Sequence, residues 1–434
     1  MNLNRRNFLF AGGATVLAGC TTSNVQRSTF NLPPIATAPV LQNAAETSIG
    51  VSFAVNRDAS GWVDIGEKPD LSDARRVFSG AHGVMTVDDR IALIRVKGLK
   101  PATKYYYRIG VDLIDYKHGY NMKNVDSVTD SKIHSFTTLG AKNRGSFCVI
   151  NDTHDVKPAI ALELKKLEAL KPSVVIWNGD ASNTSENLET AIGIFLKTHE
   201  DFPEYAADTP YMFLNGNHDF RGRFNRRLGE LMMYREPAER KGEFADLGRN
   251  FVQRLGDIAL IGLDTGEDKL DTNPIFAGIF QMKPYREEQT RWLAEAIESE
   301  AVKTAKKKVV FCHIPLYDPD PRQNPGDVAP ADYDPKYLTD YAHWQRTCAQ
   351  LWSPYFEKAG VDVVITAHRH RFRVDRPSAD RKWLHIVGGG PNLNMVKKPE
   401  SFPTVIEGRM EGDKLRLVVH NVLTGKTVFD ETIG

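Results

Sequence analysis

The chain contains 434 residues and has a formal net charge of +1, from 56 Lys and Arg against 55 Asp and Glu. This length predicts two or three domains and leaves room for a sizeable core. The hydrophobic content of 41% and the charged content of 26% are those of an ordinary globular protein. The near-neutral balance excludes the strong overall field that would point to nucleic acid or an anionic membrane surface as a partner.

The first 20 residues, MNLNRRNFLFAGGATVLAGC, predict an export signal. A charged start precedes an apolar run that is too short to span a bilayer, and small residues follow it. Arg5 and Arg6 belong to a stretch that resembles a twin-arginine motif, and Leu17 to Cys20 resembles a lipoprotein box. We therefore expect an exported protein of the bacterial cell envelope, anchored to a membrane by acyl chains on Cys20. A plain cleaved signal peptide and the general export route are the alternatives.

Residues 21–37, rich in Ser, Thr and Pro, are expected to form a linker, and residues 38–140 an all-β domain. The second segment contains short alternating, β-branched and aromatic runs without a helical period, which are typical of strands. The expected strands are TSIGVSFAV, GWVDIG, RIALIRVKGL, KYYYRIGVDL and SKIHSFTTLG. Their spacing suits a β-sandwich of about 100 residues.

One part of this segment, GLKPATKYYYRI, resembles the fibronectin type III pattern Leu-x-Pro-x-Thr-x-Tyr. The matching residues are Leu99, Pro101, Thr103 and Tyr105. The resemblance implies a fibronectin III-like sandwich in which Tyr105 is the corner tyrosine.

Residues 141–434 predict an α/β domain, because apolar strand-like runs alternate with helical patterns. Such alternation predicts a sheet with helices on both faces. The expected strands are FCVIN, VVIWN, MFLNG, IALIGLDT, KVVFC and DVVITA, and the expected helices lie at about 158–170, 186–198, 286–302 and 343–359. The last 50 residues return to strands, which we expect to pair on the same fold instead of forming a third domain.

Five of these strand-like runs end in residues that commonly bind metals. In open α/β sheets, ligands bind beyond the carboxyl ends of the strands, so these ends are expected to meet around one crevice. The candidate metal ligands are Asp152, His154, Asp180, Asn217, His313, His368 and His370.

This mixture of imidazole nitrogens, carboxylates and an amide oxygen suits first-row ions such as Fe, Mn or Zn. Seven ligands are too many for one tetrahedral ion and about right for two ions that share a carboxylate. Two such ions can clamp the attacking and leaving oxygens of a phosphoryl transfer and can lower the pKa of water to about 7. The sequence therefore predicts a binuclear hydrolytic centre.

Each of these residues alone also has an ordinary structural interpretation. An Asp after a strand can cap a helix or a turn, and a single His is often a buried core residue. Five strand ends that each acquire a ligand, in a fixed order, are not explained in this way.

The order DxH, GD, GNHD, H and HxH resembles that of the calcineurin-like metallophosphoesterases, over roughly residues 145 to 395. A β-sandwich before this domain resembles the architecture of the purple acid phosphatases. The resemblance implies two mixed β-sheets flanked by helices, and an exported phosphoesterase that hydrolyses small phosphate esters. No nucleic-acid partner is implied.

The resemblance also implies a role for each site residue. One metal would be bound by Asp152, His154 and His370, and the other by Asn217, His313 and His368. Asp180 would bridge the two, with a bridging water or hydroxide as the nucleophile. His218 would stabilise the transition state or protonate the leaving oxygen, and Asp219 would orient His218.

Two positions depart from the family pattern. Purple acid phosphatases have a tyrosine where this chain has Asn183, so a fixed ferric ion is not implied here. Ala367 stands in place of the usual glycine before His368.

The substrate residues are less well defined. Arg221 is the best candidate, and Asn183 could hydrogen-bond a phosphate. Arg223, Arg226 and Arg227 could also attract an anion, although a solvated surface is their simpler interpretation. These arginines favour a monoester slightly, and a phosphodiesterase stays open as an alternative. A non-catalytic cell-surface binding protein is a further alternative, which the complete ligand set disfavours.

Overall fold

The computed structural model describes residues 32–233, 247–276, 278–317, 343–396 and 398–434. The predicted export signal, with Arg5, Arg6 and Cys20, and most of the predicted linker lie outside these residues. Among the described helices, none is long and apolar enough to span a bilayer.

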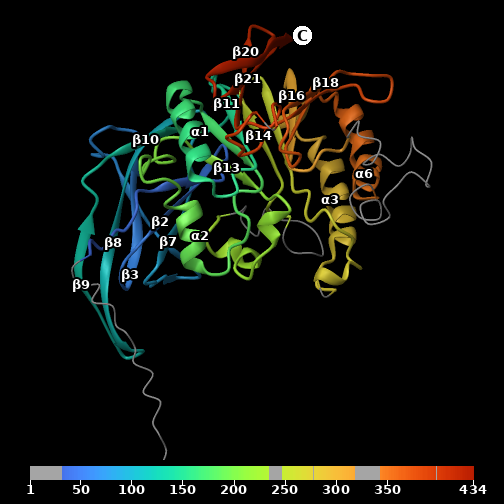
Figure 1. The fold of residues 1–434 in the computed structure, drawn as a ribbon. Coiled ribbons are helices and arrows are strands. Elements are labelled where there is room, and N and C mark those ends of the chain that lie inside the picture. The colour runs from blue at the N-terminus through green and yellow to red at the C-terminus, as the bar shows by residue number, and fades with distance from the viewer. Residues whose placement is uncertain (1–31, 234–246, 277, 318–342, 397) are drawn as a thin grey trace, which may run out of the picture. The chain divides into compact units, whose positions relative to one another are not determined.

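The N-terminal part of the described chain is all-β, as the sequence predicts (Figure 1). One sheet contains β3 (Ala59–Gly66), β4 (Arg75–Phe78), β8 (Lys104–His118), β9 (Asn121–Thr129) and β10 (His134–Thr137). A second layer contains β1 (Val40–Gln42), β2 (Ser48–Ala54) and β7 (Ile91–Lys97), and a short hairpin is formed by β5 (Gly80–Ala81) and β6 (Val84–Met85). Buried residues of the two layers belong to one core, as in a β-sandwich.

Tyr105 makes the contact expected of a corner tyrosine. Its hydroxyl accepts a hydrogen bond from the backbone N–H of Lys100 at 3.0 Å. The bond fixes the turn before β8 to the strand itself, which is the function of such a corner. The fibronectin III-like identity of the segment, and the boundary between residues 140 and 141, stay predictions.

The remaining chain forms two mixed sheets. A nine-stranded sheet has the order β22-β21-β20-β11-β12-β13-β1-β2-β7, and a six-stranded sheet has the order β14-β15-β16-β17-β19-β18. The strands not yet given are β11 (Phe147–Ile150), β12 (Val174–Asn178), β13 (Tyr211–Leu214), β14 (Phe251–Leu255), β15 (Ile258–Leu263), β16 (Lys307–Cys312), β17 (Val363–Thr366), β18 (Arg373–Asp375), β19 (Leu384–Val387), β20 (Thr404–Glu411), β21 (Lys414–Asn421) and β22 (Lys426–Ile433).

The helices are those that the sequence predicts, with shifted ends. They are α1 (Lys157–Leu170), α2 (Leu188–Phe195), α3 (Met282–Ala296), α4 (Glu300–Lys303) and α6 (His343–Ala359), with 3-10 turns η2 (His218–Phe220), η3 (Asn225–Glu230) and η5 (Pro274–Phe276). The single helix expected at 286–302 is two helices, because the chain turns between Ala296 and Glu300.

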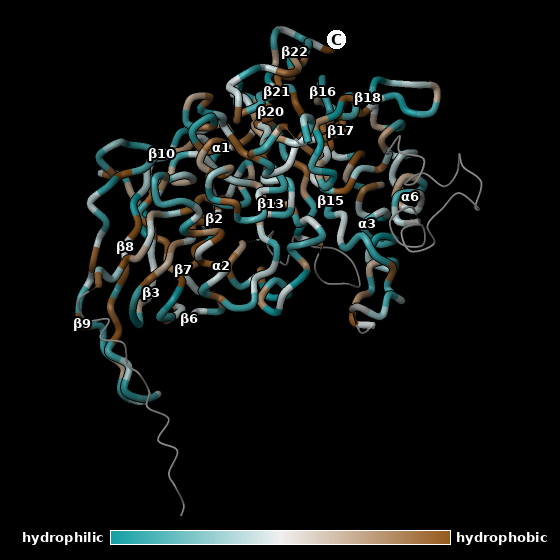
Figure 2. Tube along the Cα trace, viewed as in Figure 1, coloured by the Kyte–Doolittle hydropathy of each residue, from teal (hydrophilic) through white to brown (hydrophobic). Residues whose placement is uncertain are grey.

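Two sheets pack face to face, which confirms the two mixed sheets that the family resemblance implies and corrects the single sheet expected from the strand-helix alternation. Phe147 of β11 and Phe311 of β16 meet across them, with ring centroids 5.4 Å apart. Helices α1 and α2 pack on the outer face of the nine-stranded sheet, and α3 and α6 pack side by side on the outer face of the other (Figure 1). Hydrophobic residues are concentrated in the interior of the molecule, and many of the outer segments are hydrophilic (Figure 2).

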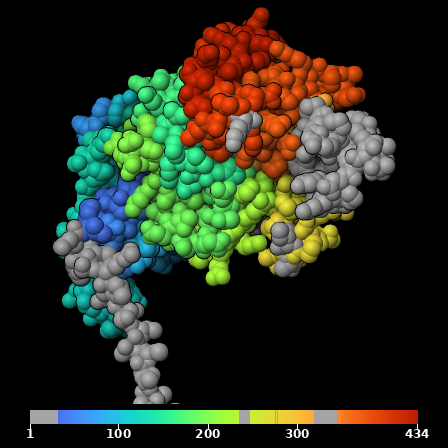
Figure 3. Space-filling view, in the orientation of Figure 1, coloured from blue at the N-terminus to red at the C-terminus, as the bar shows by residue number. Residues whose placement is uncertain are grey.

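The C-terminal strands complete the nine-stranded sheet, as predicted. β20 pairs antiparallel with β11, and β21 and β22 extend the sheet beyond it. Figure 3 shows these residues in red against the middle of the chain in green. At the other end of this sheet, β1 pairs with β13 through Gln42 and Tyr211, so strands of the N-terminal region continue the same sheet.

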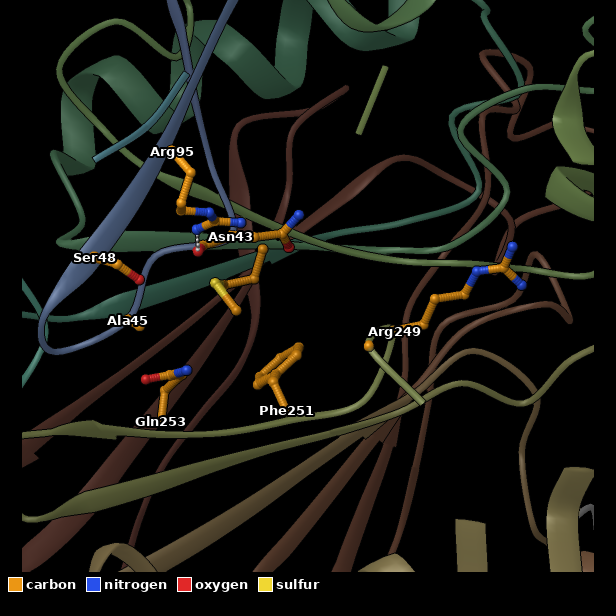
Figure 4. Close-up of a pocket in the computed structure, with 9 residues that line it drawn as sticks. Asn43, Ala45, Ser48, Arg95, Arg249, Phe251 and Gln253 are labelled. Atoms are coloured by element: carbon orange, nitrogen blue, oxygen red, sulfur yellow. Dashed lines mark hydrogen bonds between the residues drawn. The ribbon is translucent and has the colours of Figure 1, made fainter. Parts of the chain in front are cut away.

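A small cavity lies where this region meets β14 (Figure 4). Its lining includes Asn43, Ser48, Arg95, Phe251 and Gln253, and Arg95 donates a 3.0 Å hydrogen bond to the carbonyl of Asn43. Its volume of about 10 Å³ is room for about one water molecule. None of the candidate metal ligands lines it.

Helix α1 buries one acidic side chain in its apolar face. Pro158 stands in the first turn, where its missing N–H costs nothing, and Ile160, Leu164 and Leu167 face the sheet. Glu163 lies among them with only 2% of its surface exposed, and its Oε2 atom has no hydrogen-bond partner. Burial, followed by the charge of Asp152, raises the pKa of Glu163 well above its ordinary value of 4.5.

We therefore expect Glu163→Gln to stabilise the protein at high pH. A carboxyl whose pKa is higher in the folded than in the unfolded state makes stability fall as pH rises above 4.5, by up to about 1.4 kcal/mol per pH unit until the folded pKa is reached. Glutamine does not ionise, so the stability of the Glu163→Gln variant does not fall with pH for this reason. Its unfolding temperature should exceed that of the wild type at pH 8 by clearly more than at pH 5. An equal difference at both pH values would contradict the assignment.

Candidate metal centre

The five ligand-bearing strand ends lie together at one edge of the two sheets. β11, β12 and β13 are parallel neighbours in one sheet, and β16 and β17 are parallel neighbours in the other. Their loops are also joined by backbone hydrogen bonds, from Asp152 N to Gly179 O at 3.0 Å and from His154 N to Asp180 O at 2.9 Å. The loops after these strands therefore hold one another in place.

The loops bring the predicted ligands into two groups. Possible ligand atoms in the first group all lie within 4.8 Å of one another, and so do those in the second. The first group is Asp152, His154, Asp180 and His370, and the second is Asp180, His313 and His368. Asp180 belongs to both groups, as a carboxylate between two ions would.

The first group has the spacing of atoms around one ion. The Nε2 atoms of His154 and His370 lie 2.9 Å apart, and Nε2 of His370 lies 3.3 Å from Oδ1 of Asp152. Oδ2 of Asp180 lies 3.5 Å from Nε2 of His154. Two ligands that are each about 2.1 Å from an ion, at right angles, are about 3 Å apart, which agrees with these distances.

The second group includes the remaining predicted ligand. Nε2 of His313 lies 3.2 Å from Oδ2 of Asp180. Nδ1 of His368 lies 2.8 Å from Oδ1 of Asn217, which adds Asn217 to this group. All seven predicted ligands thus surround two adjoining positions.

Two buried atoms of the site lack hydrogen-bond partners among the described residues. They are Oδ1 of Asp152 and Nε2 of His313, and both residues are fully buried. The other ring nitrogen of His313 donates to the carbonyl of Asn178 at 2.8 Å, so Nε2 is free to act as a ligand. An unsatisfied buried polar atom costs about 1–3 kcal/mol, and a bound cation would remove this cost.

The electrostatics of the site also favour a cation. Burial alone would lower the pKa of His313, but the charges of Asp180 and Asp152 raise it to about 10. Burial would raise the pKa of Asp180, but the neighbouring His313, His218 and His154 hold it far below its usual range. Both shifts show that the part of the pocket around His313 and Asp180 favours positive charge beside two ionised carboxylates.

The backbone at the ligands adopts an unusual conformation. Five of the seven have positive φ angles between 46° and 67°: Asp152, His154, Asp180, His368 and His370. Residues other than glycine rarely adopt this region, and Asp and His tolerate it better than most. Such strain is typical of sites where side chains must be aimed at a shared point.

Two glycines make room for ligand side chains, Gly216 for Asp180 and Gly179 for His313. A Cβ atom on Gly216 would lie 2.2 Å from Oδ1 of Asp180, and one on Gly179 would lie 2.3 Å from Nδ1 of His313. Neither contact is possible, so both positions require glycine. Gly390 is similar, because a Cβ there would lie 2.5 Å from Cβ of His370.

His218 lies beside the ligands without joining them. Its ring meets that of His154 edge to face, with centroids 4.8 Å apart. Its Nδ1 lies 3.3 Å from the carbonyl oxygen of Asn183, and its Nε2 lies 3.1 Å from Nη1 of Arg221. Because a carbonyl can only accept, Nδ1 carries the proton and Nε2 accepts from Arg221.

Asp219 and Asn183 make contacts other than those expected. The oxygens of Asp219 accept from the backbone N–H of Gly216 at 2.9 Å and of Ser182 at 3.3 Å, so this carboxylate holds the loop and not the ring of His218. Oδ1 of Asn183 accepts from Nδ1 of His154 at 2.8 Å, which aims Nε2 of that ring at the ligand group.

The other positions singled out in the sequence lie outside the ligand groups. Ala367 is fully buried, and the chain accommodates its methyl group before His368. Arg223, Arg226 and Arg227 are exposed, with Arg226 over the ring of Phe280 and Arg227 paired with Glu230.

Sequence reasoning missed two acidic residues next to the site. Glu267 and Asp268 follow β15, where both oxygens of Glu267 bind Arg221 and Oδ2 of Asp268 lies 3.9 Å from Nε2 of His368. The signal was present, because β15 is a sixth strand that ends in acidic residues at the same edge. Burial and then Asp268 raise the pKa of Glu267 to about 7.

Comparisons with known proteins agree with this geometry. A family model described as calcineurin-like phosphoesterase matches residues 145–372, which is more than half of the chain. A search of curated proteins found no match.

Two solved structures share the fold. A purple acid phosphatase, PPD1, from yellow lupin (Lupinus luteus) seeds is 15% identical with a TM-score of 0.63, over 93% of this chain and 75% of that one. A structure of PhoD is 12% identical with a TM-score of 0.59, over 92% of this chain and 93% of that one.

We expect Asp180→Asn to lower the metal content of the protein. The shared carboxylate supplies an oxygen to both groups, so its loss should reduce a content of about two ions per chain to one or none. Elemental analysis of the purified, dialysed protein measures this content. Asp201→Asn, at an exposed aspartate outside the site, is the control and should keep two ions. Equal metal content in both variants would contradict the shared role of Asp180.

Proposed function

This chain belongs to the calcineurin-like phosphoesterase family, and from that premise we propose that it hydrolyses phosphate esters at a centre of two metal ions. The observation that carries the proposal is the convergence of seven ligands in two groups that share Asp180. The ion identities implied by the ligand set are Fe, Mn or Zn.

The ligand set fits two ions, because the site combines orphaned ligand atoms with distances suited to a common centre. Asp152, His154 and His370 would hold one ion, Asn217, His313 and His368 the other, and Asp180 both. When bound, such ions supply Lewis acidity, a nucleophile at neutral pH and a clamp on the phosphoryl group.

The chain's own residues supply the remaining chemistry. His218 and Arg221 lie next to each other beside the ligands and offer a polar pair to the phosphate and to the leaving oxygen. The carbonyl of Asn183 fixes the proton of His218 on Nδ1, which leaves Nε2 as the nitrogen that exchanges a proton at the reacting centre. Burial, which lowers the pKa of His218, keeps the ring mostly neutral in the resting site.

The direct test is hydrolysis of aryl phosphate esters by purified protein loaded with Mn, Zn or Fe. We expect metal-dependent turnover that a chelator abolishes and that His313→Ala removes. Fewer than one ion per chain, together with no turnover of either a monoester or a diester, would reject the proposal.

We expect His218→Ala to slow turnover roughly 10²–10⁴-fold while both metal ions are retained, because this residue assists the reaction without binding metal. Rate constants and elemental analysis of the same preparation check the two parts. His118→Ala, at the exposed end of β8, is the control and should leave the rate unchanged. Loss of metal in the first variant would instead make His218 a ligand.

We further propose that the protein is exported and anchored through Cys20 in a bacterial cell envelope, on the basis of the sequence MNLNRRNFLFAGGATVLAGC. Cys20→Ala should move the protein from the membrane fraction to the soluble fraction, because acylation needs the thiol. Immunoblots of the separated fractions measure this shift, with Cys348→Ala, a buried free cysteine, as control. A wild-type protein found only in the soluble fraction would overturn the anchor.

A further inference from the structure

Arg221 is held more firmly than a surface arginine would be. Its Nε and Nη2 atoms donate to the two oxygens of Glu267 at 3.1 and 2.9 Å, and Nη2 also lies 3.2 Å from Oδ1 of Asp268. The side chain of Glu267 is fully buried, and that of Arg221 is 24% exposed. Two parallel charge-assisted bonds to a buried carboxylate fix both the position and the orientation of a guanidinium.

The remaining edge of the guanidinium faces the reaction site. Nη1 lies 3.1 Å from Nε2 of His218. Arg221 therefore cannot swing towards a ligand in solution without breaking its bonds to Glu267, whereas a phosphate oxygen next to His218 can reach Nη1 directly.

The positive charges on this side of the site are already balanced. Arg221 is paired with Glu267 and Asp268, and Lys269 lies 2.8 Å from Asp268 and 3.5 Å from Glu267. Two cations thus face two carboxylates. The exposed Arg227, which could have attracted a second negative charge, is paired with Glu230.

We propose that Glu267 is a specificity-determining residue, which fixes Arg221 as a donor beside His218 and offsets its charge, so that the site prefers phosphodiesters to phosphomonoesters. A diester carries one negative charge, whereas a monoester, with a second pKa of about 6, carries nearly two at pH 8. Nη1 can hydrogen-bond either ester, but the second charge of the monoester meets Glu267 and Asp268, and the described cations beside these carboxylates, Arg221 and Lys269, are already paired with them. The inference rests on the proposed function.

The test compares bis(4-nitrophenyl) phosphate with 4-nitrophenyl phosphate, using the metal-loaded full chain. The pH is 8.5, where the carboxyl groups of Glu267 and Asp268 are both ionised. We expect kcat/KM of the wild type to be at least tenfold higher for the diester. Glu267→Gln keeps the shape of the side chain and removes its charge. It should reduce this preference about tenfold, chiefly by lowering KM for the monoester.

Two further variants distinguish a change in ester preference from a general loss of activity towards both esters. Glu267→Asp keeps the charge and should retain the wild-type preference, even if kcat falls. Glu230→Gln removes the corresponding partner of the exposed Arg227 and should change neither ester.

A wild type that prefers the monoester would overturn the inference, as would a Glu267→Gln variant that loses activity equally towards both esters. Absence of turnover with either ester would reject the proposed function itself, and this inference with it. The two failures are therefore distinguishable.

Discussion

The site depends on the placement of one carboxylate, that of Asp180, between groups carried by two different sheets. Its Oδ2 lies 3.5 Å from Nε2 of His154, which follows a strand of the nine-stranded sheet, and 3.2 Å from Nε2 of His313, which follows a strand of the six-stranded one. Its Oδ1 accepts from the backbone N–H of His218 at 2.8 Å. A shift of either sheet along its strands would separate the two ligand groups, so the packing of Phe147 against Phe311 supports the chemistry indirectly.

To place these side chains around Asp180, the backbone of several ligand residues adopts conformations that non-glycine residues disfavour. Five ligands have positive φ angles, at about 1–2 kcal/mol each, and Asp180 and His313 each sit against a glycine position that admits no side chain. The free-energy cost of this strain is offset by backbone hydrogen bonds between neighbouring loops, such as that from Ala367 N to His313 O at 2.8 Å. The large core behind the loops also offsets it. Bound cations would add to these by satisfying the orphaned atoms of Asp152 and His313.

The sequence was sufficient for features that depend on residue type and order. It predicted the main strands and helices around the site and the convergence of the seven candidate ligands, because strand ends with Asp, Asn and His are unusual in combination. It missed β9, whose residues NMKNVDSVT are polar and exposed and pair only with β8. The strand pattern alone predicted one sheet, and only the family resemblance predicted two; neither could predict the pairing of Gln42 with Tyr211, because its partners lie far apart in the chain. Glu267 escaped notice because an acidic residue in a loop is ordinary until Arg221 is placed beside it.

The candidate metal ligands and the charged residues beside Arg221 come from different loops of the fold. The metal ligands come from the ends of β11, β12, β13, β16 and β17, where strain and close packing leave little freedom for substitution. The negative charge beside Arg221 comes from the loop after β15, which supplies Glu267 and Asp268 but none of the seven candidate ligands. Asp268 lies 3.9 Å from Nε2 of His368 and so adjoins a candidate ligand, whereas Glu267 contacts Arg221. Because Glu267 contacts Arg221 and not a candidate ligand, the proposed function would make ester preference adjustable at this residue separately from metal binding.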